Sequence, residues 1–205
     1  SAASSDVGKA LKYLKDSSGM KKLVFDLRGN GGGLLHESVN IVNFFIAKGK
    51  TVVATKGRLT DLNRDYKTLN TPFDEEMPIV VLVDGYSASA SEIVCGALQD
   101  HKRAIIMGRR TFGKGLVQQQ IVLNDSSELR ITTSRYYTPS GKCIQKPYGE
   151  NINYEDDIYQ RMDNGELTSS EDIKDTSSKK YGAGGIIPNI FIPIDTSMNS
   201  FSFNE

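Results

Sequence analysis

The sequence has no excess of charge of either sign, few cysteines and no long hydrophobic run. Its 25 Lys and Arg residues balance 25 Asp and Glu residues, so neither nucleic acid nor an anionic membrane surface is an expected partner. Two cysteines, Cys95 and Cys143, cannot build a disulfide framework, and without CxxC or HExxH spacing no metal site is expected. We expect both to serve in packing. Every apolar stretch is shorter than the roughly 20 residues that span a bilayer, and the start does not resemble a signal peptide.

The length predicts a single domain. A chain of 205 residues can bury one sizeable core, so we expect residues 1–205 to form one catalytic or binding unit. Because the chain opens at Ser1 and not at Met, we expect it to be a processed or excised piece. The missing targeting signals therefore say little about its compartment.

The first half of the sequence alternates between helix and strand patterns. Apolar residues at helical spacing predict helices over 5–19, 34–50 and 91–102. Short apolar runs predict strands over 21–27, 51–57 and 77–84, the last two joined by a polar connection. Strands that alternate with helices favour an α/β fold.

The second half is dominated by consecutive strand patterns. They predict strands over 103–108, 116–123 and 128–141, and a closing edge strand over 186–194. Residues 149–185 are polar and weakly periodic, so we expect a mobile excursion there, and a loose tail is expected over 199–205. Together the halves predict a mixed α/β core.

Two glycine-rich motifs resemble nucleotide-binding loops, and both matches fail. In "GNGGGL" the third glycine position of the dinucleotide fingerprint holds Leu34. What remains is a strand, a glycine turn and a helix, where backbone N–H groups can approach an anion or simply form a tight turn. "GRRTFGKG" has Gly115 where a phosphate-binding loop needs Ser or Thr, and a strand pattern follows it instead of a helix. Lys114 therefore needs another explanation.

Three serines follow a strand in "VLVDGYSASASEIV", residues 81–94. Ser89 and Glu92 fit the S-x-x-E capping box, so Ser89 could simply cap the next helix. The same corner would expose Ser89 as a nucleophile, with the N–H of Ala90 directed from the positive helix end. Spacing alone leaves both interpretations open.

A serine nucleophile needs a base, and the sequence offers only His36 and His101 as histidines. Neither stands in a familiar hydrolase order, so both are expected to be surface residues. A lysine can serve as the base where burial lowers its pKa from about 10.4. Lys114, between Gly113 and Gly115, is the lysine in a plausible setting.

Three ordered motifs resemble the carboxyl-terminal processing proteases, also called tail-specific proteases. They read "LVFDLRGNGGG", "SASASEIVCGALQD" and "GRRTFGKGLVQ", and "YYTPSGKCIQ" follows them. The resemblance covers roughly residues 8–146. It implies a ClpP/crotonase-like α/β fold with a mixed sheet and flanking helices, and a serine endopeptidase that needs no cofactor or metal.

The resemblance also implies roles for particular residues. It makes Ser89 the nucleophile, Lys114 the general base and Gln118 the residue that orients the lysine. Ala90 and either Gly32 or Gly33 would supply the N–H groups of an oxyanion hole. On a straight strand, Lys114 and Gln118 would lie about 13 Å apart, so their contact requires a bend at the flanking glycines.

Substrates and location are implied by the same resemblance. The expected substrates are unfolded polypeptides or their C-terminal tails, in the periplasm, cell envelope or plastid lumen, and a homo-oligomer is possible within the family. Family members usually carry a PDZ domain before the core, and we expect this chain to lack it because few residues precede the first helix. Removal of that domain should leave low activity.

Two other functions remain open on the same fold. One is an acyl-CoA hydrolase or isomerase, in which two N–H groups stabilise a thioester enolate; it would leave Ser89 and Lys114 without a role. The other is a non-catalytic binding module.

Overall fold

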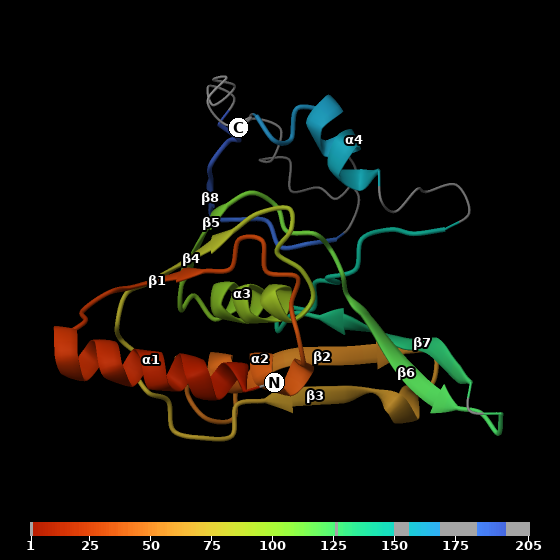
Figure 1. The fold of residues 1–205 in the computed structure, drawn as a ribbon, viewed down its shortest axis with the longest axis horizontal. Coiled ribbons are helices and arrows are strands. Elements are labelled where there is room, and N and C mark those ends of the chain that lie inside the picture. The colour runs from red at the N-terminus through yellow and green to blue at the C-terminus, as the bar shows by residue number, and fades with distance from the viewer. Residues whose placement is uncertain (1, 126, 150–155, 169–183, 196–205) are drawn as a thin grey trace.

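Among the residues that the structure describes, the strands form two four-stranded sheets (Figure 1). The computed structural model describes residues 2–125, 127–149, 156–168 and 184–195. The helical elements are α1 (Ala3–Ser18), α2 (Leu35–Asn43), the 3-10 turn η1 (Thr60–Leu62), α3 (Ala90–Asp100) and α4 (Asp157–Asp163). The strands are β1 (Leu23–Asp26), β2 (Thr51–Gly57), β3 (Arg64–Lys67), β4 (Ile79–Val83), β5 (Ile105–Gly108), β6 (Leu116–Val122), β7 (Glu128–Tyr137) and β8 (Ile190–Phe191).

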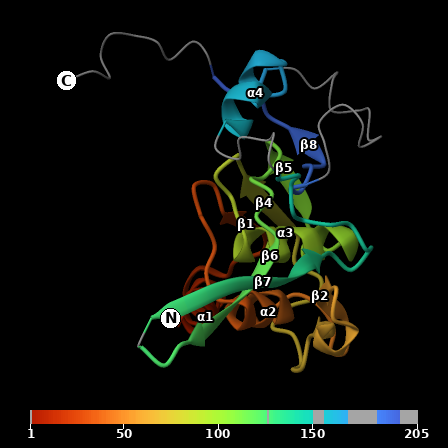
Figure 2. The ribbon, with the colours of Figure 1, turned by 90° about the vertical axis from the view of Figure 1, so that its right-hand side faces the viewer.

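The two sheets differ in strand direction. One has the order β1-β4-β5-β8 and is parallel throughout, and the other has the order β3-β2-β7-β6 and is antiparallel. The predicted α/β class, with parallel and antiparallel strands and flanking helices, is confirmed. The parallel strands form one sheet and the antiparallel strands form the other, in place of one mixed sheet. The β6–β7 ribbon extends away from the body of the molecule (Figure 2).

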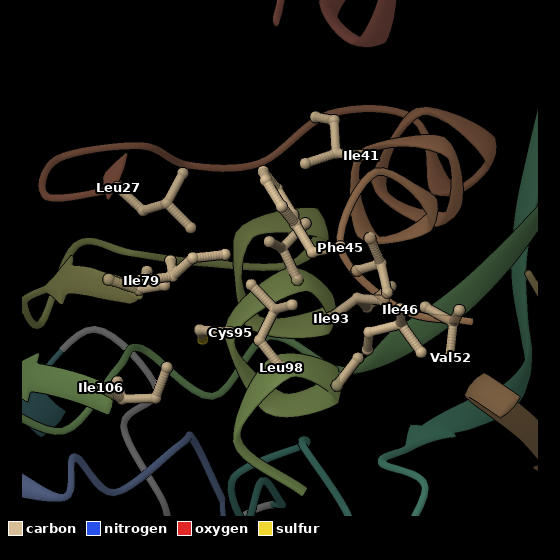
Figure 3. Packing of buried hydrophobic residues seen from close by; sticks show 14 of the residues in the cluster. Leu27, Ile41, Phe45, Ile46, Val52, Ile79, Ile93, Cys95, Leu98 and Ile106 are labelled. Atoms are coloured by element: carbon tan, nitrogen blue, oxygen red, sulfur yellow. The ribbon is translucent and has the colours of Figure 1, made fainter. Parts of the chain in front are cut away.

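Helix α3 lies between the two sheets and forms the centre of the core (Figure 1). Its residues 90–98 are all buried, which explains why small and apolar residues occur on every side of this helix. In Figure 3, Ile93 and Leu98 pack near Phe45 and Val52, while Cys95 lies toward Ile106. Because α3 begins at the serine motif, burial of the helix fixes the position of that motif.

Most predicted elements are present, and the differences have tertiary causes. Helix α2 ends before the predicted stop at Gly49, because the Asn43 side chain accepts hydrogen bonds from the N–H groups of Leu69 (2.7 Å) and Asn70 (2.8 Å). Strand β3 lies inside the stretch predicted as a polar connection. It is an edge strand in which Arg64, Asp65 and Lys67 are exposed and Tyr66 alone packs against the core, so it lacks an apolar pattern.

Part of the predicted excursion has regular structure. Of residues 149–185, the segment 156–168 contains α4 and the turns after it, and Arg161 on this helix is buried. Residues 150–155, 169–183 and the predicted tail at 199–205 lie outside the described part of the chain.

The cysteines are both free thiols, and Cys95 is buried in the core as predicted, whereas Cys143 is half-buried. Burial raises the pKa of the Cys95 thiol. Within the described ranges, no helix has the length and apolar character needed to cross a bilayer.

Asp74 joins α1 to the loop before β4, and it generates a prediction about stability. Its carboxylate accepts hydrogen bonds from the N–H groups of Met77 (2.8 Å) and Glu76 (2.9 Å) and from Lys15 Nζ (3.0 Å). These contacts lower the pKa of Asp74 from its ordinary value of 3.8 to about 2. A carboxyl with a depressed pKa contributes stability that is present above its unfolded value and is lost as the pH falls through its folded value.

We expect Asp74→Asn to lower the free energy of unfolding at pH 7 by about 1–2 kcal/mol, because the charge-assisted bonds are weakened. Urea unfolding at several pH values measures this, and the variant should lose less stability than the unmodified chain between about pH 4 and pH 2. Asp16→Asn, which alters an exposed carboxyl of α1, is the control. Equal losses in both variants would contradict the prediction.

Candidate active site

Ser89 occupies a strained corner between β4 and α3. It is the N-cap residue of α3 with φ 57° and ψ −115°, and Lys102 is the one other non-glycine residue with positive φ among the described residues. Such a conformation costs about 1–3 kcal/mol and is found where a site needs it. A sharp turn from strand to helix is also the way other folds expose a nucleophilic serine.

The two serines beside it have structural roles. The Ser87 hydroxyl donates to the carbonyl oxygen of Leu27 (2.7 Å), and the Ser91 hydroxyl donates to Oδ1 of Asn30 (3.0 Å). Both serines are buried, and both bonds join the serine motif to the loop after β1. The Ser89 hydroxyl, which is half-buried, donates no hydrogen bond to any residue that the structure describes.

The glycine loop after β1 packs directly against the serine corner. Gly32 has φ +93°, and a Cβ atom there would lie 2.5 Å from the Ala88 oxygen and 2.7 Å from the Ala90 nitrogen. Only glycine permits this approach. The Gly32 N–H donates to Asn30 Oδ1 (2.9 Å), while the N–H groups of Gly33 and Ala90 have no acceptor in the described ranges.

Glu92 connects the corner at Ser89 (the serine corner) to residues 110–114, the loop that leads to Lys114 (the lysine loop). Its side chain is fully buried, and Oε2 accepts hydrogen bonds from the N–H groups of both Ser89 (2.8 Å) and Lys114 (2.8 Å). Oε1 accepts from the Gly113 N–H (2.7 Å) and the Thr111 hydroxyl (2.5 Å). Burial raises the pKa of Glu92, and these four donors oppose that shift. One carboxylate therefore anchors both segments that carry the predicted catalytic pair.

Lys114 does not have the burial that a neutral lysine requires. Gly113 and Gly115 on either side of it are buried, but the Lys114 side chain is exposed, because glycine neighbours offer no side chains to cover it. Its Nζ atom has no ion pair or hydrogen bond with a described residue. The expectation of a buried lysine is wrong for this chain alone.

Gln118 lies on β6 and is exposed. The chain between Lys114 and Gln118 is not a straight strand, since β6 begins at Leu116 and its pairing with β7 shifts register between Val117 and Gln118. Gly113, which precedes Lys114, has φ +88°. The contact-forming bend expected at the flanking glycines stays a prediction. No hydrogen bond joins Lys114 to Gln118, and the role of Gln118 stays a prediction.

Neither histidine is hydrogen-bonded to Ser89. His101 is the C-cap of α3, about 18 Å from Ser89 along that helix, and its Nε2 atom contacts the Thr51 carbonyl oxygen (2.7 Å). His36 is exposed on α2 beside Glu37. The stretch after Lys114 is a strand, which agrees with the rejection of a phosphate-binding loop.

A small cavity of about 110 Å³ opens beside Gly32, Gly33 and Ala90. Much of its lining is apolar, with Phe25, Leu27, Leu34, Ile41 and Val94 among the contributors. The volume is far below the roughly 300–1,000 Å³ of sites for drug-sized ligands. It can therefore admit one short side chain.

Sequence reasoning missed the clamp formed by Glu92. The S-x-x-E pattern predicted a capping box in which Ser89 caps α3, and both halves of that box are present. The three donors from residues 111–114 come from a segment about 20 residues later in the chain, and no local pattern pairs them with Glu92.

Comparison with known proteins identifies the family. The profile of peptidase family S41 matches residues 1–158. The chain belongs to peptidase family S41. It is 46% identical over 144 residues to the carboxy-terminal-processing protease of Bartonella bacilliformis, which covers 69% of this chain and 33% of that protein. It is 47% identical over 137 residues to a probable CtpA-like serine protease of Staphylococcus aureus, covering 65% of this chain and 27% of that one.

A solved structure supports the same assignment. The S41 chain resembles the photosystem II D1 C-terminal processing protease with a TM-score of 0.68 and 29% identity, over 94% of this chain and 40% of that one. The expected resemblance to carboxyl-terminal processing proteases is thus confirmed. The S41 chain spans a third or less of the length of the two sequence relatives.

The Glu92 clamp generates a prediction. In Glu92→Gln, whichever way the amide is turned, its NH2 group faces a backbone N–H of Ser89, Gly113 or Lys114. We expect an unfolding free energy lower by about 2–3 kcal/mol, measured by urea denaturation, because at least one buried donor loses its acceptor. Glu76→Gln, at an exposed position, is the control and should change stability by less than about 0.5 kcal/mol. Equal stability of the two variants would refute the clamp.

Proposed function

We propose that this chain is the catalytic core of a serine endopeptidase in which Ser89 is the nucleophile and Lys114 the general base. The observation that carries the proposal is that Glu92 Oε2 accepts hydrogen bonds from the backbone N–H groups of both residues. The involvement of Ser87 and Ser91 in structural bonds supports the choice of Ser89 among the three serines.

In the proposed mechanism, Ser89 Oγ attacks the carbonyl carbon of the scissile peptide bond while its proton passes to Lys114 Nζ. The carbonyl oxygen becomes an oxyanion. When the tetrahedral intermediate collapses, the C–N bond breaks and Lys114 gives the proton to the leaving amine. A water molecule then attacks the acyl-enzyme ester, with Lys114 again accepting the proton, and the acid product leaves as Ser89 recovers its hydrogen.

The oxyanion would be held by the N–H groups of Ala90 and Gly33. The Ala90 N–H lies in the first turn of α3, where the helix dipole favours negative charge. The Gly32 N–H already donates to Asn30, which supports Gly33 as the second donor. In this arrangement Gly32 provides the space that brings the loop against the serine corner.

The exposed position of Lys114 indicates that substrate completes the site. A bound polypeptide over this surface would displace water from the amine and so favour its neutral form. Gln118 would orient the lysine only after such a rearrangement, because the two side chains are not bonded here. We therefore expect low activity toward substrates that bind weakly.

The proposed substrates are polypeptides, with C-terminal tails as the preferred segments. The names of the Bartonella protein and of the D1 processing protease both refer to carboxy-terminal processing. Action outside the cytoplasm remains a proposal that rests on family resemblance.

The catalytic pair gives a direct test. We expect Ser89→Ala and Lys114→Ala each to lower cleavage of an unfolded protein by at least about 1,000-fold, since nucleophile and base act as a unit. In the unmodified chain, the rate should rise from pH 6 to pH 10, because a general base accepts a proton only in its unprotonated form. Lys142→Ala, which changes an exposed lysine, is the control. Cleavage that persists in Ser89→Ala would refute the proposal.

The small cavity predicts a cleavage preference. Because it adjoins the proposed oxyanion donors, we expect it to receive the side chain just before the scissile bond. Peptides with alanine or valine at that position should then be cleaved at least about tenfold faster than matched peptides with phenylalanine or arginine. Mass spectrometry of the products measures the ratio, and equal rates for all four peptides would exclude this cavity as the specificity pocket.

A further inference from the structure

Helix α4 contacts the loop that leads to Lys114 through one buried arginine. Arg161 is 1% exposed, and its Nη1 atom donates to the carbonyl oxygens of Arg110 (3.0 Å) and Thr111 (2.9 Å). Its Nη2 atom donates to the carbonyl oxygen of Phe112 (3.1 Å). One guanidinium thus binds three consecutive carbonyl groups, and the last of them lies two residues before Lys114.

The N–H groups of the same loop are bound by other partners. The Phe112 N–H donates to the Ser87 carbonyl oxygen (3.0 Å), and the N–H groups of Gly113 and Lys114 donate to Glu92. The loop has no regular secondary structure that could pair its backbone internally. Since buried backbone groups need partners, its conformation depends on both sets of bonds.

Ion pairs hold α4 in place. Asp157 Oδ2 lies 2.8 Å from Arg161 Nη2 and 3.2 Å from Lys146 Nζ. In the turn after α4, the Glu166 carboxylate accepts hydrogen bonds from Nε (2.6 Å) and Nη2 (2.8 Å) of Arg110, and this ion pair is buried. Buried pairs of this kind stabilise only when complete, because loss of one partner leaves an uncompensated charge.

Helix α4 makes few apolar contacts, and one of them is with the loop that leads to Ser89. The central hydrophobic cluster includes no residue of this helix. Ile158 of α4 reaches Gly85 in the loop that leads to Ser89, where an added Cβ atom would lie 3.0 Å from its Cδ1 atom. Helix α4 therefore touches the loops that precede both Ser89 and Lys114, and polar contacts dominate its attachment.

We propose that Arg161 is a positioning residue for the proteolytic reaction, and that docking of α4 sets the backbone of residues 110–114 and so places Lys114 opposite Ser89. This inference rests on the proposed role of Lys114 as the base. When α4 is displaced, three buried carbonyl groups lose their donors and the loop relaxes toward other conformations. The site is then competent only while α4 is docked.

Two variants and one control test this positioning role. Arg161→Met removes the donors and keeps much of the side-chain volume, and Arg161→Lys keeps the charge but cannot reproduce the planar fork. Met162→Ala, at a residue 62% exposed on the same helix, is the matched control. Cleavage kinetics and hydrogen exchange of the Gly113 and Lys114 amides are measured in all three and in the unmodified chain.

We expect kcat to fall roughly 10- to 100-fold in Arg161→Met, with KM within about twofold, because a small misplacement of the base affects the chemical step more than binding. Arg161→Lys should be intermediate. The Gly113 and Lys114 amides should exchange faster in Arg161→Met, while the amides of β4 and α3 keep their protection. The Met162→Ala control should match the unmodified chain.

Other results would overturn the inference. If Arg161→Met retains the kcat and the amide exchange of the control, Arg161 does not position the loop. If exchange accelerates equally in β4 and α3, Arg161 supports the whole fold and not the lysine loop. Failure of the proposed function would be distinct: Ser89→Ala would cleave as the unmodified chain does, while the exchange measurement would still decide what Arg161 holds.

Discussion

The buried carboxylate of Glu92 is the interaction on which the candidate site depends. It accepts hydrogen bonds from the serine corner, which follows β4, and from the lysine loop, which follows β5. A carboxylate without water needs donors around it, and both segments need an acceptor for their N–H groups. Glu92 meets both requirements at once, so its four hydrogen bonds stabilise the burial of the two segments against each other.

Hydrogen bonds between a few side chains and backbone groups hold the site together. The loop after β1, the serine corner and the lysine loop all lack regular structure at their contacts, and each is bonded through N–H or C=O groups to Asn30, Ser87, Glu92 or Arg161. Glycine at position 32 allows the first two segments to approach within contact distance. Among the described residues, neither the Ser89 hydroxyl nor Lys114 Nζ donates a hydrogen bond, which leaves both groups available for the roles proposed for them.

The elements that could be predicted from sequence are those whose cause is local. Helix α1 ends at Gly19, where φ is +59°, and β2 covers the predicted residues 51–57, because a turn residue and an apolar run carry these signals. The early end of α2 could not be predicted, since Asn43 finds its partners about 26 residues later in the chain. Strand β3 lacked a signal because only one of its four residues, Tyr66, packs against the core.

By itself the sequence determined the family, the α/β class and the identity of the candidate pair, because three ordered motifs contain the residues that this chemistry needs. Only the tertiary structure decided that Glu92 joins Ser89 to Lys114, that Lys114 is exposed, and that Arg161 braces the loop before it. These facts arise from hydrogen bonds and burial between distant segments. No local sequence pattern predicts such contacts, because the partners come together only when the chain folds.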